Sequence, residues 1–175
     1  IGQNVIVEFN RLAFEGLKIE SDLHHFELRT TSYGYFANLA DVLDADFLPL
    51  FHDLYPFLMA TIESNEGVMG QRMGDTSGLE ALVEDEGEEA LEGEKVNFSV
   101  QIPFVEEKKT AIALIGALSN VLGKHLAPYV EKFLPKLIEL CDFLHSDVRE
   151  AAVQALPAIM HIMNDTFPNP AGKWE

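Results

Sequence analysis

Two segments of the chain repeat one another in register, and this repetition constrains the fold more than any other feature of the sequence. Residues 31–63 match residues 110–142 when the first segment is shifted by 79 positions. The matched pairs are Thr31 and Thr110, Leu39 and Leu118, Val42 and Val121, Leu43 and Leu122, Pro49 and Pro128, Pro56 and Pro135, and Leu58 and Leu137. A second match, at a shift of 41, places residues 106–122 on residues 147–163, mostly by apolar class. The chain is therefore expected to use one structural unit several times.

The period of the apolar residues predicts that this unit is helical. In residues 4–17, apolar side chains recur at spacings of three and four, which gives a helix one apolar face. Nothing in the sequence reads as a confident strand pair. Helices are predicted near residues 3–18, 24–43, 47–63, 105–122, 126–144 and 147–164, alternating as the first and second helix of a hairpin.

The prolines have different expected roles at their two positions. The first proline of each pair suits the first turn of a helix, where its missing N–H is no loss. Pro56 and Pro135 lie inside the helical pattern, so both are predicted to bend or break their helices.

These units predict an all-α fold, an α-solenoid or armadillo-like superhelix of about three two-helix repeats within one domain. The first repeat is placed at residues 1–45, the second at 46–123 with an insertion at 64–103, and the third at 124–165, before a tail at 166–175. The opening residues already read as the middle of a structured element, so the chain is expected to be part of a longer one. Ends that lack neighbouring repeats are expected to expose apolar surface and to favour self-association.

The segment LPKLIELCDFLHSDVREAAVQAL, residues 134–156, resembles the HEAT repeat in the order of its apolar run, turn and second-helix start. Asp147 opens the second helix, near its positive end. Arg149 resembles the HEAT arginine, which the resemblance implies pairs between neighbouring repeats.

The insertion is strongly acidic, with eight carboxylates and one basic residue between Glu80 and Lys95. Such a run cannot be buried without positive partners, because desolvating a carboxylate costs several kcal/mol. It is either a solvated loop or a limb that attracts basic partners collectively. Residues 96–104 follow with strict alternation of apolar and polar types, which predicts an extended segment with one apolar edge. That edge either anchors the loop on the solenoid or holds the acidic run over its inner surface.

The order of these parts resembles the middle repeats of importin-β (karyopherin-β) transport receptors over roughly residues 24–164. It is most similar to the importin-4 and importin-5 subgroup, which carries histones and ribosomal proteins into the nucleus. The most specific piece is the acidic insertion followed by the extended segment and a helix start with Glu107, Lys108 and Ala111. The chain departs from the family in one respect, because Gly, Ala and Leu interrupt its acidic tract.

The resemblance implies a nuclear import receptor that binds basic cargo and shuttles between cytoplasm and nucleus, with Ran GTPase and nucleoporins bound through a longer parent chain. Candidate cargo contacts are Glu84, Asp85, Glu86, Glu88, Glu89, Glu92, Glu94 and Glu106. Weaker candidates on the inner face of the second helices are Asn38, Asp41, Asn120 and Gln154.

Charge and composition narrow the functional classes further. The net charge of −17 disfavours direct binding to nucleic acid or anionic membranes, because a polyanion repels both. The six histidines and the single cysteine lack metal-ligand spacing, and the acidic pairs lack a rigid scaffold for acid–base chemistry. No enzyme, metal or cofactor is expected. Two alternatives stay open: a HEAT scaffold subunit of a phosphatase or chromosome-organising complex, and an insertion that covers the inner surface as an autoinhibitory limb.

Overall fold

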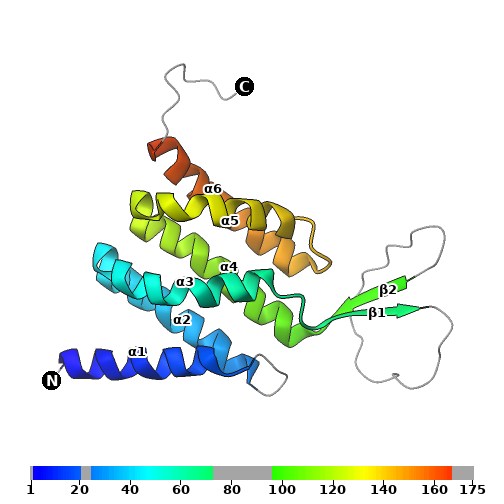
Figure 1. Ribbon diagram of the computed structural model, residues 1–175, viewed down its shortest axis with the longest axis horizontal. Helices are drawn as coiled ribbons and strands as arrows, with labels where there is room; N and C mark the ends of the chain where they lie inside the picture. Colours follow the sequence, from blue (N-terminus) through cyan, green and yellow to red (C-terminus); the bar gives the residue numbers. More distant parts are fainter. Residues whose placement is uncertain (1, 21–24, 73–95, 167–175) are drawn as a thin grey trace.

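The computed structural model describes residues 2–20, 25–72 and 96–166. Within these ranges six α-helices follow one another as three hairpins: α1 (Gly2–Lys18) with α2 (Phe26–Leu43), α3 (Leu48–Glu63) with α4 (Ile102–Leu122), and α5 (Ala127–Leu140) with α6 (Ser146–Thr166). The hairpins stack from α1 at the bottom of Figure 1 to α6 at the top. Contacts between hairpins run α2 to α4 to α6 in one layer and α3 to α5 in the other. The predicted all-α solenoid of three repeats is confirmed.

The observed helix bounds agree closely with the predicted ones, with two differences. Helix α5 ends at Leu140, and residues 141–144, which the sequence pattern assigned to the helix, lie in the turn before α6. Helix α4 begins at Ile102, so the alternation of residues 96–104 marks a strand only as far as Val100. Pro103 sits in the first turn of α4, where the helix needs no N–H from it, and this is why the helix can begin so early.

Short 3-10 turns connect each hairpin to the next. They are η1 (Asp44–Phe47) and η2 (Gly123–Leu126), and a shift of 79 superposes their sequence positions. Each turn buries an apolar residue at its fourth position, Phe47 in η1 and Leu126 in η2. The same connection therefore places the following helix in the same way twice.

Of the predicted bend or break at Pro56 and Pro135, a break does not occur. Helix α3 continues through Pro56 and α5 continues through Pro135. Pro157 also lies inside a continuous helix, α6, a case that the sequence analysis did not single out. All three prolines lie on exposed faces, where water can satisfy the carbonyl groups that lose their helical N–H partner.

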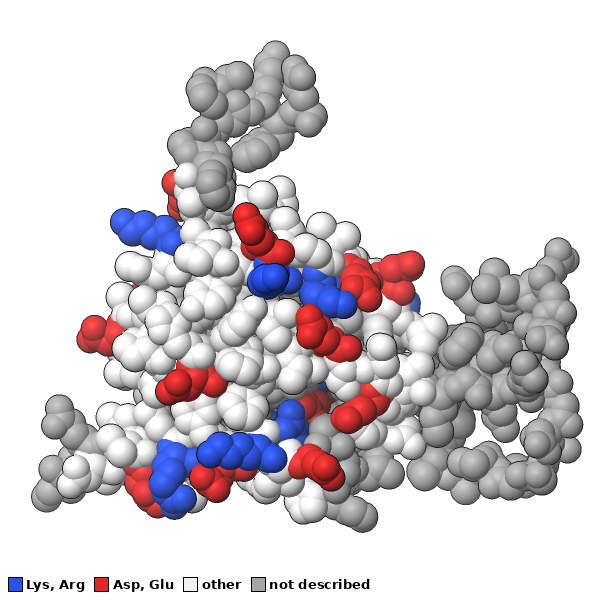
Figure 2. Space-filling model, in the orientation of Figure 1, with Lys and Arg blue, Asp and Glu red and all other residues white. Residues whose placement is uncertain are grey.

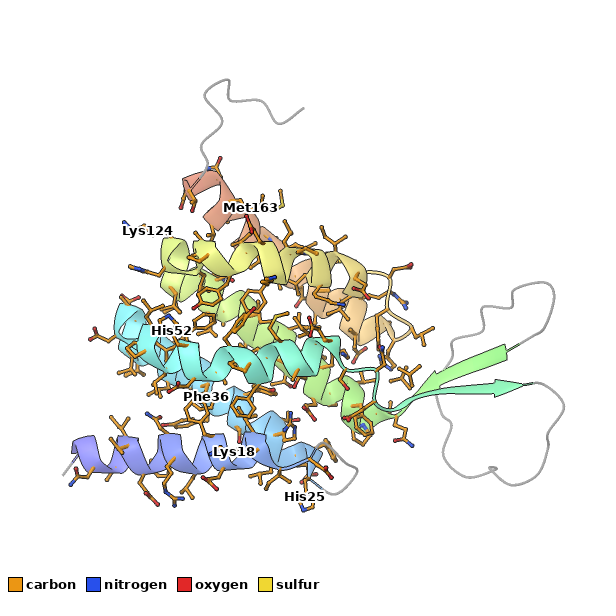
Figure 3. All side chains as sticks on the ribbon, viewed as in Figure 1. Lys18, His25, Phe36, His52, Lys124 and Met163 are labelled. Carbon is orange, nitrogen blue, oxygen red and sulfur yellow. The ribbon has the colours of Figure 1, made fainter. Side chains whose placement is uncertain are left out.

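The core lies between the two layers of helices and is rich in aromatic rings. Phe36 of α2 is fully buried, with its ring centroid 4.7 Å from that of Phe14 and 6.3 Å from that of Phe47. Figure 3 shows Phe36 in the space between α1 and α3. A second group of rings joins α3 to α5, where Phe51 and Tyr129 meet edge to face at 4.8 Å. These contacts fix the spacing of successive hairpins.

A two-stranded antiparallel sheet stands at the base of the insertion, which the sequence analysis did not predict. Strand β1 (Val68–Arg72) pairs with β2 (Val96–Val100), from Val68 opposite Val100 to Arg72 opposite Val96. Figure 1 shows this pair projecting away from the helices at the junction of α3 and α4. The insertion therefore leaves and re-enters the solenoid at one place.

One stretch of the described chain is apolar enough to cross a membrane by composition. Residues 102–140 contain an 18-residue window with mean hydropathy 1.3, but half of that window is buried inside the protein. The stretch consists of α4, η2 and α5, so its apolar residues are those of central core helices.

Candidate functional site

The predicted cargo contacts fall in two parts of the chain. Glu106 lies in the second turn of α4, half-buried, and accepts a hydrogen bond of 2.9 Å from the Nζ of Lys109. The other predicted contacts lie outside the described residues: Glu84, Asp85, Glu86, Glu88, Glu89, Glu92 and Glu94. The described part of the candidate site is therefore its root, where the insertion joins α3 and α4.

Two backbone positions close this root. The N–H of Gln101 donates to the carbonyl oxygen of Gly67 at 3.1 Å, which extends the pairing of β1 and β2 toward the helices. Gly67 has φ +77°, and the Phe104 ring occupies the space that a Cβ would need. A glycine is required at this position on both counts.

Lys108 of α4 binds the C-terminal end of α3. Its Nζ donates to the carbonyl oxygens of Thr61 at 2.8 Å, Ile62 at 3.0 Å and Ser64 at 2.8 Å. The side chain is only 4% exposed, and burial lowers the pKa of Lys108 to about 8. The Phe143 ring covers it, with Nζ 5.5 Å from the ring centroid. A cation is favourable here because the C-terminal carbonyls of a helix carry partial negative charge.

A second buried group joins the first repeat to the second. Arg29 of α2 donates through Nε to Oε1 of Glu107 on α4 at 2.8 Å, and both side chains are nearly inaccessible to solvent. The same guanidinium donates through Nη1 to the carbonyls of Leu17 and Ile19 at the end of α1. Thr61 donates to Glu107 at 3.2 Å. Each charge is therefore paired and further hydrogen-bonded, as burial demands.

Tyr33 extends this group toward α3. Its hydroxyl shares a hydrogen bond of 2.7 Å with Thr61 and lies 3.1 Å from the carbonyl oxygen of Phe57, to which it donates. Burial raises the pKa of Tyr33 to about 12. The phenol is thus held neutral and serves as a structural donor.

An open pocket of about 410 Å³ lies over these residues. Its lining combines carboxylates and cations from both repeats: Glu20, Arg29, Ala60, Thr61, Ser64, Glu66, Phe104, Glu107 and Lys108. The described part of the chain holds no group of His, Cys, Asp and Glu side chains arranged to bind a metal. The pocket is chiefly the solvent-facing edge of the hydrogen-bonded residues at the insertion root.

The second helices carry the weaker candidates on their surfaces. Asn38 and Asp41 on α2, Asn120 on α4 and Gln154 on α6 are all exposed. Asp41 and Asn120 occupy equivalent positions under the shift of 79. Asn38 donates to the carbonyl of Gly34, and Gln154 to Glu150, so these two also have contacts within their own helices.

Asp147 and Arg149 behave differently from one another. Asp147 joins neighbouring repeats, because its carboxylate lies 3.4 Å from Nζ of Lys109 on α4. Among the described residues, the contacts of Arg149 lie within its own hairpin, and its predicted pairing with a neighbouring repeat stays a prediction. Arg149 donates to the carbonyl oxygens of Phe143 and Leu144, both at 2.8 Å. These two residues lie in the turn directly before α6, within reach of the Arg149 side chain.

Charged side chains of both signs lie on the visible face (Figure 2). Along α1, at the bottom of Figure 2, blue and red side chains lie beside one another. Arg11 pairs with Glu8 at 2.7 Å and Lys18 with Glu15 at 3.5 Å. The basic residues of this helix are thus already matched by carboxylates.

The sequence analysis missed the roles of Arg29, Glu107 and Lys108 at the root. A signal was present in the two repeat shifts, which place Arg29, Lys108 and Arg149 at one equivalent position. A basic residue kept at the same point of three second helices could have been read as a structural cation.

The comparisons with known proteins agree with this arrangement. Residues 105–158 match a family model described as a HEAT-like repeat, which spans α4 to α6. The chain is 28% identical over 152 residues to the probable importin subunit beta-4 of Schizosaccharomyces pombe, covering 83% of the chain and 14% of that protein. It is 26% identical over 152 residues to importin-4 of Homo sapiens, covering 81% of the chain and 14% of that protein. Both relatives are importins, and the likeness to each extends over about four-fifths of the chain.

The predicted resemblance to importin-4-type members of the importin-β family is thereby confirmed. The chain spans about a seventh of the length of these relatives. It also resembles the eIF-2-alpha kinase activator GCN1 of Dictyostelium discoideum, at 29% identity over 113 residues, which cover 61% of the chain and 4% of that protein. The likeness to importins thus extends over more of the chain than the likeness to GCN1.

Proposed function

We propose that this chain is a cargo-binding segment of a nuclear import receptor, and that its acidic insertion attracts the basic segments of histones or ribosomal proteins. The observation that carries the proposal is the likeness to two importins over more than four-fifths of the chain. The proposed contacts are Glu84, Asp85, Glu86, Glu88, Glu89, Glu92 and Glu94, with Glu106 at the start of α4. The proposal includes no catalytic step and no cofactor.

Electrostatics supports a collective mode of binding. A single exposed carboxylate–ammonium pair contributes only about 0–1 kcal/mol. A dense run of carboxylates raises the local concentration of a polybasic ligand and speeds its encounter, with strong dependence on salt. Such a field selects basic segments without a strict sequence match. The exposed residues Asn38, Asp41, Asn120 and Gln154 would add shorter-range contacts along the second helices.

The proposal also concerns the partners and the cellular location of a full-length receptor that contains this chain. Ran GTPase and nucleoporins would bind elsewhere on such a receptor, and the protein would shuttle between cytoplasm and nucleus through the nuclear pore. Direct binding to nucleic acid or membrane is not part of the proposal, because the net charge of −17 opposes both.

The test compares a Lys/Arg-rich histone-tail peptide with a neutral peptide of equal length, over a range of salt concentrations. A variant with Glu84→Gln, Asp85→Asn, Glu86→Gln, Glu88→Gln and Glu89→Gln keeps the length of the insertion and removes five charges. We expect it to bind the basic peptide roughly tenfold more weakly at low salt, since each lost pair contributes a few tenths of a kcal/mol.

A matched control removes five exposed carboxylates elsewhere, namely Asp46, Asp53, Glu131, Glu150 and Asp165. It has the same net charge as the insertion variant, so it should bind nearly as the unaltered chain does. Equal weakening in both variants would reduce the effect to net charge and remove the insertion from the cargo site. No binding of the basic peptide by the unaltered chain at low salt would overturn the receptor function.

A second candidate function is a HEAT scaffold that holds a phosphatase or chromosome-organising complex together. The likeness to GCN1 favours keeping it, because that protein is named as a kinase activator and not as a transport receptor. A scaffold would bind partners independently of the charge of the insertion. The same peptide titration therefore separates the two functions.

A further inference from the structure

Three cations occupy equivalent positions in the three repeats. The shift of 79 places Arg29 on Lys108, and the shift of 41 places Lys108 on Arg149. Each side chain donates to a carbonyl oxygen in the connection between the two helices of its own hairpin, that of Ile19, Ser64 and Phe143 respectively. Arg29 and Lys108 also donate to carbonyls in the last turn of the first helix, and so neutralise its negative end.

The second repeat uses this contact across a much longer connection. Arg149 reaches carbonyls only 5 and 6 residues earlier, and Arg29 reaches carbonyls 10 and 12 residues earlier. Lys108 reaches carbonyls 44, 46 and 47 residues earlier, because the insertion separates them in the sequence. The contact that closes a short turn in the other repeats therefore closes the whole insertion here.

Lys108 is suited to this role by its chemistry. An ammonium group is a compact charge with three rotatable donors, and here it has three carbonyl acceptors at 2.8 to 3.0 Å. Ser64, the third acceptor, lies just past the end of α3, on the chain that leaves for β1. The ammonium therefore holds the departing chain directly against the returning helix.

The root has a second closure a few residues further out. Gln101 donates to Gly67, and the Phe104 ring packs where a Gly67 side chain would stand. Phe143 of the third repeat covers the Lys108 ammonium, so the root is also tied to the next hairpin. Contacts at two separate points fix the direction of the strand pair, whereas a single contact would leave the pair free to rotate.

We propose that Lys108 is a positioning residue that sets the direction in which β1 and β2 leave the solenoid, and that this direction determines the affinity for polybasic segments. The second part of this inference, the effect on affinity, rests on the proposed function. The first part, the direction of β1 and β2, stands on the described contacts alone.

The sign of the charge effect distinguishes positioning from simple electrostatics. Lys108 is a cation among the carboxylates Glu66, Glu107 and Glu139, with Lys136 also nearby. Removing a positive charge makes this region more negative, so simple electrostatics predicts tighter binding of a basic peptide. Positioning predicts weaker binding from the same substitution.

The experiment measures binding of the histone-tail peptide to Lys108→Met, with Lys136→Met as the matched control. Lys136 carries the same charge nearby, but its side chain is 32% exposed and pairs with Glu139 outside the root. We expect Lys108→Met to weaken binding about three- to tenfold and Lys136→Met to leave it unchanged or slightly tighter. Equal or tighter binding by Lys108→Met would overturn the role in affinity.

A distance measurement tests the direction itself. Spin labels at Gln71→Cys in β1 and Met160→Cys in α6, in a Cys141→Ser background, report how the strands lie relative to the third repeat. We expect a narrow distance distribution in the parent and one at least twice as broad in Lys108→Met. An unchanged distribution would overturn the positioning role, and it does so whether or not the peptide binds.

Gly67→Ala provides a second variant in which no charge changes. It opens the outer closure, because an alanine Cβ would overlap the Phe104 ring. We expect the same broadening and the same loss of affinity as in Lys108→Met. Broadening without loss of affinity would uphold the direction and overturn its link to binding. Absence of peptide binding in the parent would instead count against the proposed function, leaving the spin-label result to decide on Lys108.

Discussion

Arg29 and Glu107 form a buried ion pair across 78 positions of the sequence, with Nε and Oε1 2.8 Å apart. The pair joins α2 of the first repeat to α4 of the second, and Arg29 is 8% and Glu107 3% exposed. The guanidinium also binds the end of α1, so one side chain ties together three helices. This pair is therefore expected to control how the first repeat docks on the rest of the solenoid.

Replacing one partner of this pair should destabilise the protein strongly. Glu107→Leu leaves the Arg29 charge buried without its carboxylate, and we expect the free energy of unfolding to fall by about 3 to 5 kcal/mol. The double variant Arg29→Met with Glu107→Leu removes both charges and should recover at least ~1 kcal/mol of that loss. Urea unfolding of the four proteins measures the coupling between the two side chains.

The exposed pair of Lys136 and Glu139 is the control for this measurement. Its atoms lie 2.8 Å apart, but both side chains are accessible to water. Its coupling should be below about 1 kcal/mol. Additive effects of Arg29→Met and Glu107→Leu would contradict the proposed role of the buried pair.

The repeated apolar pattern was sufficient to predict the helices because each hairpin buries one face of each helix in the same way. Proline positions were harder to interpret, because the effect of Pro56 and Pro135 depends on whether their helix face meets water. Both faces are exposed, and the helices continue. Whether the helix continues depends on the exposure of the proline in the folded protein. The apolar pattern of one helix does not give that exposure.

The insertion root was less predictable than the helices. Strand β1 has no strict alternation, and it forms beside β2 through pairing between residues 24 to 32 positions apart. The contacts of Arg149 within its hairpin were not predicted, because their acceptors are carbonyl oxygens, which every residue has. A side chain that binds a backbone carbonyl has no complementary side chain as its partner. The sequence therefore contains no second residue that would reveal the contact.

Tyr33 predicts a loss of stability at alkaline pH. Its pKa is raised by burial to about 12 in the folded protein, against 10.0 for an unperturbed tyrosine. Folding therefore keeps a proton that the unfolded chain loses, so the contribution is complete below pH 10 and is lost as pH rises to 12. The free energy of unfolding should fall by about 2 to 3 kcal/mol over this interval from Tyr33 alone.

Tyr33→Phe isolates this effect in urea unfolding at pH 9, 10, 11 and 12. The variant loses the hydrogen bonds to Phe57 and Thr61, so it should be less stable at pH 9. Its stability should then change less between pH 10 and 12 than that of the parent. Parallel curves for the two proteins would show that another group causes the alkaline loss.

Gly67→Ala should disturb the strand pair while leaving the helices folded. The substitution combines a positive φ with overlap of the Phe104 ring, and a residue other than glycine at such a φ costs of order 1 kcal/mol before any overlap. Hydrogen exchange should accelerate at the Gln101 amide, which donates to Gly67, with little change in the α4 interior. Gly34→Ala is the control, because a Cβ there meets no atom within 4 Å. Unchanged protection of Gln101 would contradict the closure.

Asp44→Gly should stabilise the protein. Asp44 has φ +51°, and it is the counterpart of Gly123, which has φ +49° at the equivalent point of the next repeat. The same turn therefore carries an aspartate in a strained conformation in one copy and a glycine in the other. Backbone strain of this kind costs about 1 to 3 kcal/mol, whereas the added freedom of glycine in the unfolded chain costs about 0.5 to 1 kcal/mol. We expect a net gain of about 1 kcal/mol in the free energy of unfolding.

Two controls separate relief of strain from other effects of the glycine. Asp46→Gly lies two residues further in the same 3-10 turn without a positive φ, and it should lower the free energy of unfolding by about 0.5 to 1 kcal/mol. Gly123→Asp introduces the strain into the second copy and should lower it by about 1 kcal/mol or more. Thermal and urea unfolding of the three variants provide the comparison. A loss of stability in Asp44→Gly equal to that in Asp46→Gly would mean that the turn holds Asp44 without strain, and the two connections would then be equivalent in geometry but not in energy.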